Sequence, residues 1–112
     1  MRSQHNAWLH AAATVAAIVL ALLLHFRVRP FTAGEWCGLA VSIVAVWVAE
    51  TFNTGLEVLA EAITHERHPT LKIAKDVAAA AVLLASGGAV VVGAILFVPR
   101  LGELLGWMPP VR

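Results

Sequence analysis

The sequence predicts an all-α integral membrane protein with three transmembrane helices in each subunit. Of the 112 residues, 60% are hydrophobic and only 13% are charged, which is far from the balance of a soluble domain of this length. In addition, three long apolar runs are separated by short polar segments, the pattern expected of helices that cross a bilayer. A chain this short forms a single membrane domain over residues 1–112.

The composition also excludes several kinds of function. The formal net charge of +1 is too small, and the basic residues are too scattered, for nucleic-acid binding through the phosphates. Because Cys37 is the single cysteine, neither an intrachain disulfide nor a cysteine metal cluster is possible. The chain has no glycine loop of the Walker or protein-kinase type, which excludes the conventional nucleotide-binding folds.

The first predicted span covers residues 7–26, which carry no formal charge and match the roughly 20 residues that cross a bilayer. A cleavable signal peptide is disfavoured, because the run is longer than a signal-peptide core and no small-x-small site followed by polar chain comes after it. His10 and His25 are expected to be interface or packing residues rather than ligands. Residues 27–34 contain Pro30 and form a tight turn before the next span.

The second predicted span covers residues 36–63, and its uncharged part, residues 36–49, is too short to cross a bilayer alone. The span is complete only if Glu50 lies at membrane depth or just inside the interface. An unpaired carboxylate is costly there, and such residues are usually functional. On one helix Glu50, Asn53 and Glu57 follow at i, i+3 and i+7, so they share a face.

The third predicted span covers residues 77–98, after a short loop over residues 64–71. It is rich in Ala and Gly, which let membrane helices approach closely. Pro99 is expected to stop this helix and to leave residues 100–112 as a short tail. With three spans, four basic residues fall on each side of the membrane, so the positive-inside rule does not set the orientation.

The polar stretch of residues 50–76 contains the groups that phosphoryl transfer requires. This reaction needs a carboxylate to take a proton from the attacking hydroxyl, carboxylates to hold Mg²⁺, and a cation for the phosphate oxygens. Glu50, Glu57 and Lys75 are the candidates for these three roles. In the simpler interpretation, the glutamates are solvated acids at a helix end, and Lys75 and Asp76 are surface charges at the start of a helix without a functional role.

A zinc site is disfavoured in the same stretch. The residues His65, Glu66, Arg67 and His68 are one residue short of the zinc-protease pattern H-E-x-x-H, so the two histidines would not be presented on one helical face in the way that this zinc site needs.

Two motifs resemble those of the prokaryotic diacylglycerol kinase family. The first is A-E-x-x-N-T-x-x-E over residues 49–57, and the second combines H-P at residues 68–69 with K-I-A-K-D-V-A-A at residues 72–79. The family contains the small membrane diacylglycerol kinases and the undecaprenol kinases, and the second motif looks closer to the latter. The resemblance covers essentially the whole chain from the first span onward.

The resemblance implies a homotrimer in the inner (plasma) membrane, with an ATP and Mg²⁺ site that faces the cytoplasm and a membrane lipid as substrate. It implies that Glu50 is the catalytic base and contacts the substrate, that Glu57 binds Mg²⁺ and the nucleotide, and that Asn53 is a polar partner of the phosphates and the substrate. The further nucleotide-binding positions are Glu66, Arg67, His68, Lys75 and Asp76. Ala79 is implied to contact the substrate.

The chain departs from the family pattern near its start. Members of the family usually carry an amphipathic surface helix and a further acidic metal ligand there, and the ligand position falls on Gln4. An amide oxygen can bind Mg²⁺ but adds no charge, which predicts weaker binding of metal and ATP unless another carboxylate substitutes. A variant branch, a start inside a longer reading frame and a loss of activity would each explain this. Arg67, where the family often has an aromatic residue, is a smaller departure.

The function predicted from the sequence is transfer of the ATP γ-phosphate to the hydroxyl of a lipid, either undecaprenol or diacylglycerol. The alternative is a catalytically impaired or non-catalytic three-span protein of the same fold that binds lipid as a scaffold. A small channel that uses the buried acids is a third possibility, and it would produce ion flux in liposomes.

Overall fold

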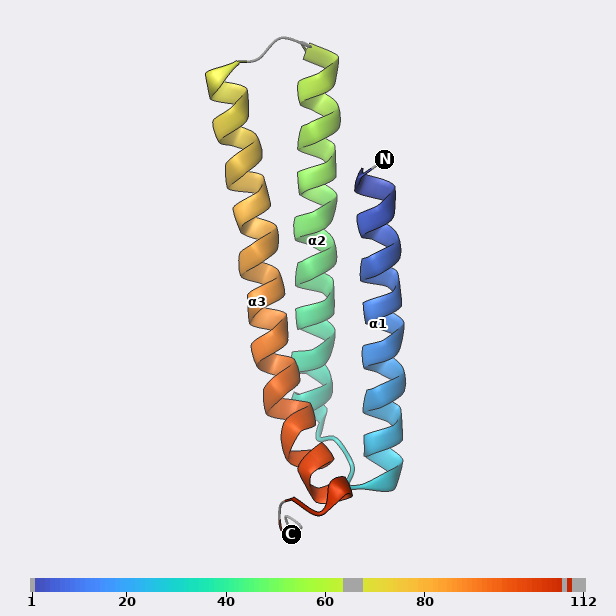
Figure 1. Cartoon of the computed structure of the whole chain (residues 1–112). Helices are drawn as coiled ribbons and strands as arrows, with labels where there is room; N and C mark the ends of the chain where they lie inside the picture. The colour runs from blue at the N-terminus through green and yellow to red at the C-terminus, as the bar shows by residue number, and fades with distance from the viewer. Residues whose placement is uncertain (1, 64–67, 108, 110–112) are drawn as a thin grey trace.

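The structure is a computed structural model that describes residues 2–63, 68–107 and 109, with side chains described from Ala7 onward. Its described part contains three helices, α1 (Arg2–Arg27), α2 (Ala33–Ile63) and α3 (Pro69–Leu105). They run side by side in alternating directions and form a rod 59 Å long (Figure 1). All three are long and apolar enough to cross a membrane, and no strand occurs in these residues. The predicted fold class is therefore confirmed.

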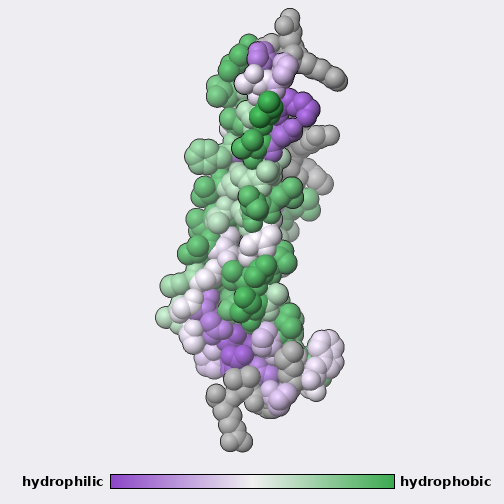
Figure 2. Space-filling view, turned by 90° about the vertical axis from the view of Figure 1, so that its left-hand side faces the viewer, coloured by the Kyte–Doolittle hydropathy of each residue, from purple (hydrophilic) through white to green (hydrophobic). Residues whose placement is uncertain are grey.

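The surface of the rod is suited to a bilayer. Large apolar side chains are exposed along every helix, for example Val19, Val44 and Leu84. Hydrophobic residues cover the shaft in Figure 2, whereas hydrophilic residues gather toward the two ends. In water such a surface would be unstable, but in a membrane the lipid chains cover it.

The ends of α2 and α3 follow known capping chemistry. Thr32 and Glu35 form a capping box at the start of α2: the Glu35 N–H donates to Thr32 Oγ1 and the Thr32 N–H donates to Glu35 Oε1, both at 3.0 Å. Helix α3 is capped by Gly106, whose positive φ of 80° closes a Schellman motif in which the Trp107 N–H donates to the Gly102 carbonyl at 2.7 Å.

Both predicted ends of α3 were wrong, whereas the first span was not. Helix α1 begins at Arg2 and so extends before the predicted first span, while its membrane-spanning part, Ala7–Arg27, agrees with the predicted residues 7–26. Helix α3 begins at Pro69 instead of after a loop that ends at residue 71, because proline is favourable at the first helical position, where its missing N–H has no partner to lose. Pro99 does not stop α3, which continues to Leu105. The predicted tail is thus helical in residues 100–105.

The hydrophobic core lies toward the α1–α2 turn. Its buried members are Ala21, Leu24, Phe31, Leu39 and Leu96, and Trp36 and Phe97 are among the side chains packed around it. The helix contacts are also uneven, since α2 packs mainly against α3 while α1 contacts both helices much less. The end of the bundle near the α1–α2 turn is therefore the better-packed end.

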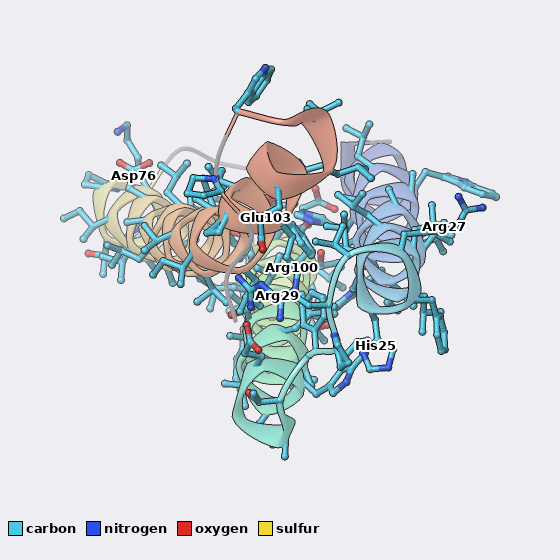
Figure 3. All side chains as sticks on the ribbon, turned by 90° about the horizontal axis from the view of Figure 1, so that it is seen from below. His25, Arg27, Arg29, Asp76, Arg100 and Glu103 are labelled. Atoms are coloured by element: carbon cyan, nitrogen blue, oxygen red, sulfur yellow. The ribbon has the colours of Figure 1, made fainter. Side chains whose placement is uncertain are left out.

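Four charged residues fasten this end, and we call Arg29, Glu35, Arg100 and Glu103 the basal clasp. Arg100 is only 1% exposed, and its guanidinium donates to both carboxylate oxygens of Glu35 at 2.8 and 2.9 Å. Arg29 Nε donates to Glu103 Oε2 at 3.0 Å. Seen from below, Arg29, Arg100 and Glu103 lie together where the three helices meet (Figure 3).

The donors of Arg100 are fully used. Beyond Glu35, its guanidinium donates to the carbonyls of Arg29, Pro30 and Leu96, and it lies 3.8 Å from the centre of the Phe31 ring. An arginine has five N–H donors, and each of them has an acceptor here. This arrangement explains how Arg100 stays charged inside the bundle, and it offers a reason why α3 continues past Pro99.

Candidate functional site

Glu50 is a buried carboxylate within the bundle. Its side chain is 8% exposed, and it faces α1 from the part of α2 beyond the apolar run. His10 Nε2 lies 3.3 Å from Glu50 Oε2. The other oxygen, Oε1, is buried and has no hydrogen-bond partner among the described residues. Glu50 thus keeps one acceptor unused in an environment where unused acceptors are costly.

A short chain of hydrogen bonds joins α1 to α2 beside Glu50. Trp47, one helical turn before Glu50, donates from its indole Nε1 to Thr14 Oγ1 at 2.9 Å. The Thr14 hydroxyl in turn donates to the backbone carbonyl of His10 at 2.7 Å. The rings of His10 and Trp47 are tilted, with centroids 6.1 Å apart. These contacts fix the backbone of His10 relative to the turn of α2 that carries Glu50.

Asn53 and Glu57 lie on the same side of α2 as Glu50, one and two turns further along. Both side chains are half-buried, and Asn53 Nδ2 donates to Glu57 Oε1 at 3.4 Å. Among the described residues, no partner is recorded for the amide oxygen of Asn53 or for the second oxygen of Glu57. The face predicted from the helical period therefore exists as an inward-facing row of polar side chains.

The predicted nucleotide-binding residues on α3 are exposed. Asp76 accepts a hydrogen bond from Lys72 at 2.9 Å, and both side chains lie mostly in solvent. Lys75 and Ala79 are also exposed on α3, and His68 precedes the helix in an extended conformation without a side-chain cap. The structure does not bring Lys75 or Asp76 into a recorded contact with Glu50 or Glu57.

Three predicted site positions lie outside what the structure describes. Glu66 and Arg67 are in the segment between α2 and α3 that is not described. Gln4 lies within α1, but its side chain is not among those described. Their predicted roles in nucleotide and metal binding stay predictions.

The spacing along the helices indicates where these groups lie in a bilayer. The pair Glu35 and Arg100 gives a common origin, and at 1.5 Å per residue Glu50 lies ~22 Å above it and Glu57 ~33 Å above it. Asp76 lies ~36 Å above the same pair. Since the hydrocarbon layer is ~30 Å thick, a basal clasp at one boundary would put the other boundary between Glu50 and Glu57. The face then spans the interface opposite the clasp.

The donor set on this face is compatible with Mg²⁺ bound together with a nucleotide. Among the described residues no group of three or more His, Cys, Asp or Glu could hold a metal ion on its own. Mg²⁺, however, is commonly held by one or two carboxylates together with substrate phosphates and water. Glu57 offers such a carboxylate, and the amide nitrogen of Asn53 donates to it.

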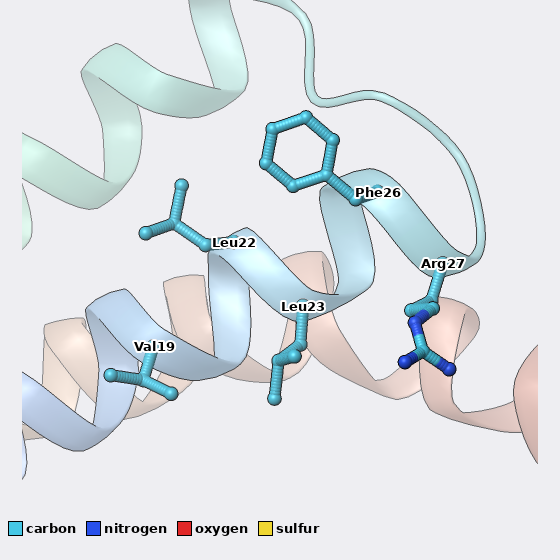
Figure 4. A pocket seen from close by; sticks show the side chains of 5 residues that line it. All are labelled: Val19, Leu22, Leu23, Phe26 and Arg27. Carbon is cyan, nitrogen blue, oxygen red and sulfur yellow. The ribbon is translucent and has the colours of Figure 1, made fainter.

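A separate groove lies on the outer side of α1, near the α1–α2 turn. Val19, Leu22, Leu23 and Phe26 line it, and Arg27 lies at its end (Figure 4). The groove belongs to one helix and contains none of the predicted site residues. In a membrane it is an apolar surface for lipid chains.

Two features of the structure were not predicted from the sequence. His10 was expected only to pack or to lie at the interface, yet it contacts Glu50. The basal clasp was not predicted either, although the pattern T-x-x-E at Thr32 and Glu35 is a capping signature that a sequence search can find. The pairing of Glu35 with Arg100 has no comparable local signal, because the two residues are far apart in the chain.

Three helices that are long and apolar enough to cross a membrane, with a buried carboxylate on the second, fit a multi-pass membrane protein with a polar site inside the bundle. The chain belongs to the prokaryotic diacylglycerol kinase family, whose model matches residues 1–97. Family membership makes it a membrane lipid kinase.

Two relatives agree with this assignment. The chain is 31% identical to the undecaprenol kinase of Bacillus subtilis over 100 residues, which are 89% of this chain and 77% of that protein. It is 38% identical to the diacylglycerol kinase of a Synechocystis species over 104 residues, which are 92% of this chain and 57% of that protein. The chain thus matches little more than half the length of the second relative. No solved structure matches it at a significant level.

Proposed function

We propose that the chain transfers the γ-phosphate of ATP to the hydroxyl of a membrane lipid, with Glu50 as the general base. The observation that carries this proposal is the state of the Glu50 carboxylate: Oε2 lies against His10, while buried Oε1 has no partner among the described residues. A lipid hydroxyl that donates to Oε1 would satisfy this acceptor. A base within hydrogen-bond reach of the proton is what general-base catalysis requires.

In this reaction Oε1 of Glu50 takes the proton of the lipid hydroxyl as the hydroxyl oxygen attacks the γ-phosphorus. A new bond forms between that oxygen and phosphorus, and the bond from phosphorus to the β–γ bridging oxygen breaks, so that ADP leaves. Glu57, with Asn53 beside it, would hold Mg²⁺ on the phosphates. When bound, the metal neutralises the charge that develops on the phosphate oxygens.

The nucleotide would enter from water. By residue count, Glu57 and Asp76 lie at similar heights, beyond the ~30 Å hydrocarbon layer measured from the clasp. Lys75 and Asp76 on α3, with Glu66, Arg67 and His68 before it, are proposed to bind the phosphates and the nucleoside. Gln4 is proposed as a second metal ligand. Since ATP is cytoplasmic, this end would face the cytoplasm from the inner (plasma) membrane.

A homotrimer and the choice of lipid also belong to the proposal. The trimer follows from the family resemblance, and the exposed apolar helix faces leave room for neighbouring copies as well as lipid. The names of the two relatives supply the two lipids to test, undecaprenol and diacylglycerol.

The test uses purified protein in detergent micelles with γ-labelled ATP, Mg²⁺ and either lipid. We expect label in the lipid product, and we expect Glu50→Gln to lower kcat by about 10²- to 10⁴-fold, the usual contribution of a general base. Thr51→Val removes the hydroxyl of the exposed neighbour and serves as the matched control with unchanged kcat. Full activity of Glu50→Gln would disprove the base assignment, and no transfer to either lipid would disprove the reaction.

A further inference from the structure

The two oxygens of the Glu50 carboxylate have different surroundings. Oε2 lies 3.3 Å from Nε2 of His10, and Oε1 has no partner among the described residues. Of the polar side chains that the structure describes, His10 is the one recorded in contact with this carboxylate. The carboxylate therefore has one oxygen in contact with His10 and one oxygen without a partner among the described residues.

His10 is itself held in place. Its side chain is 23% exposed, and its backbone carbonyl accepts from the Thr14 hydroxyl at 2.7 Å. Thr14 accepts from the indole N–H of Trp47 at 2.9 Å. Since Trp47 precedes Glu50 by one turn of the same helix, this brace keeps His10 and Glu50 in register across two helices. The backbone that carries the imidazole is thus joined to the helix whose carboxylate the imidazole contacts.

We propose that His10 is a positioning residue for the kinase reaction, holding Oε2 of Glu50 so that Oε1 faces the lipid hydroxyl. The proposal rests on the proposed role of Glu50 as the base. The terminal torsion of a glutamate side chain is broad, so a carboxylate without a partner would rotate. Misplacement of a reacting group by about 1 Å can cost about 100-fold in rate. An imidazole contact from a braced helix limits that rotation.

A positioning role predicts a particular pattern of kinetics. His10→Leu removes the polar contact at similar volume, so we expect kcat to fall by about 100-fold. The KM values for ATP and lipid should change by less than about 2-fold, because His10 touches the base and not the substrates. His10→Gln keeps an N–H donor, and we expect it to recover kcat to within about 10-fold of wild type.

A double variant at His10 and Glu50 distinguishes a positioning role from a general loss of structure. In a Glu50→Gln background, His10→Leu should cause no further loss of kcat, because the effect of His10 acts through the carboxylate. Thr14→Val removes the brace at nearly constant volume, and it should lower kcat by about 3- to 10-fold at unchanged KM. It also tests the proposal should His10→Leu fail to fold. Leu9→Ala, a change at an exposed apolar neighbour, is the control and should leave kcat unchanged.

The experiment measures lipid phosphorylation by wild type and these variants in one detergent, together with the Tm of each. Expected are the kcat losses with intact Tm, the recovery in His10→Gln and the absence of further loss in the double variant. Wild-type kcat in both His10→Leu and Thr14→Val, or an equal further loss from His10→Leu in the Glu50→Gln background, would overturn the positioning role alone. An inactive wild type, or a fully active Glu50→Gln, would instead overturn the proposed function and this inference with it.

Discussion

Arg100→Met should destabilise the folded bundle strongly, although it lies far from Glu50. The change removes five N–H donors and leaves Glu35 without its cationic partner. Removing one member of a buried ion pair costs about 3–5 kcal/mol, because the other charge is left uncompensated. Glu35 is 24% exposed and can be partly rehydrated, so we expect the lower end, about 3 kcal/mol. This corresponds to about 100-fold in the folding equilibrium constant.

The measurement is the free energy of unfolding in mixed micelles, with dodecyl sulfate as denaturant and helical circular dichroism as signal. Lys72→Met is the matched control, since it removes an ion pair that lies in solvent, and it should unfold like wild type. Adding Glu35→Gln to Arg100→Met should restore part of the loss, because no buried charge is then left unpaired. If Arg100→Met unfolds within about 0.5 kcal/mol of wild type, the clasp does not hold the bundle together.

Three further predictions concern other residues. Glu57→Gln should raise the Mg²⁺ concentration needed for half-maximal activity by about 10-fold in a Mg²⁺ titration. Glu61→Gln, at an exposed position one turn further along, should leave that concentration unchanged, and the same titration curve for both variants would contradict a metal-binding role of Glu57. Lys75→Met should raise the KM for ATP and leave that for lipid unchanged in initial-rate measurements, and the reverse pattern would contradict a nucleotide role. Thr32→Ala should cost about 1 kcal/mol in the same unfolding assay without lowering kcat, because it removes the capping box of α2 but lies far from Glu50.

The three helices and the Glu50 face could be predicted because both depend on local patterns. An uncharged run of sufficient length predicts a membrane span, since unpaired charges in the hydrocarbon are costly. The 3.6-residue period places Glu50, Asn53 and Glu57 on one side, as the structure shows. The roles of these residues in base catalysis and metal binding stay predictions.

The errors and omissions have a common origin in contacts between helices. Pro99 removes one backbone hydrogen bond, and a rule based on that loss ends the helix there. That rule does not take tertiary contacts into account. In the structure, Arg100 follows Pro99 in the same helix and donates hydrogen bonds to carbonyls of the α1–α2 turn. The contact between His10 and Glu50 likewise depends on the relative position of α1 and α2 along their axes. The period of either helix alone does not determine that position.

The hydrophobic core and the clasp both lie at the end away from Glu50, so the contacts between α1 and the other helices are concentrated at that end. Beside Glu50, few recorded contacts join α1 to α2, namely the hydrogen bond from the indole of Trp47 to Thr14 and the contact of the His10 imidazole with Glu50. A long-chain lipid would approach this carboxylate from the side, within the membrane, without disturbing the basal clasp.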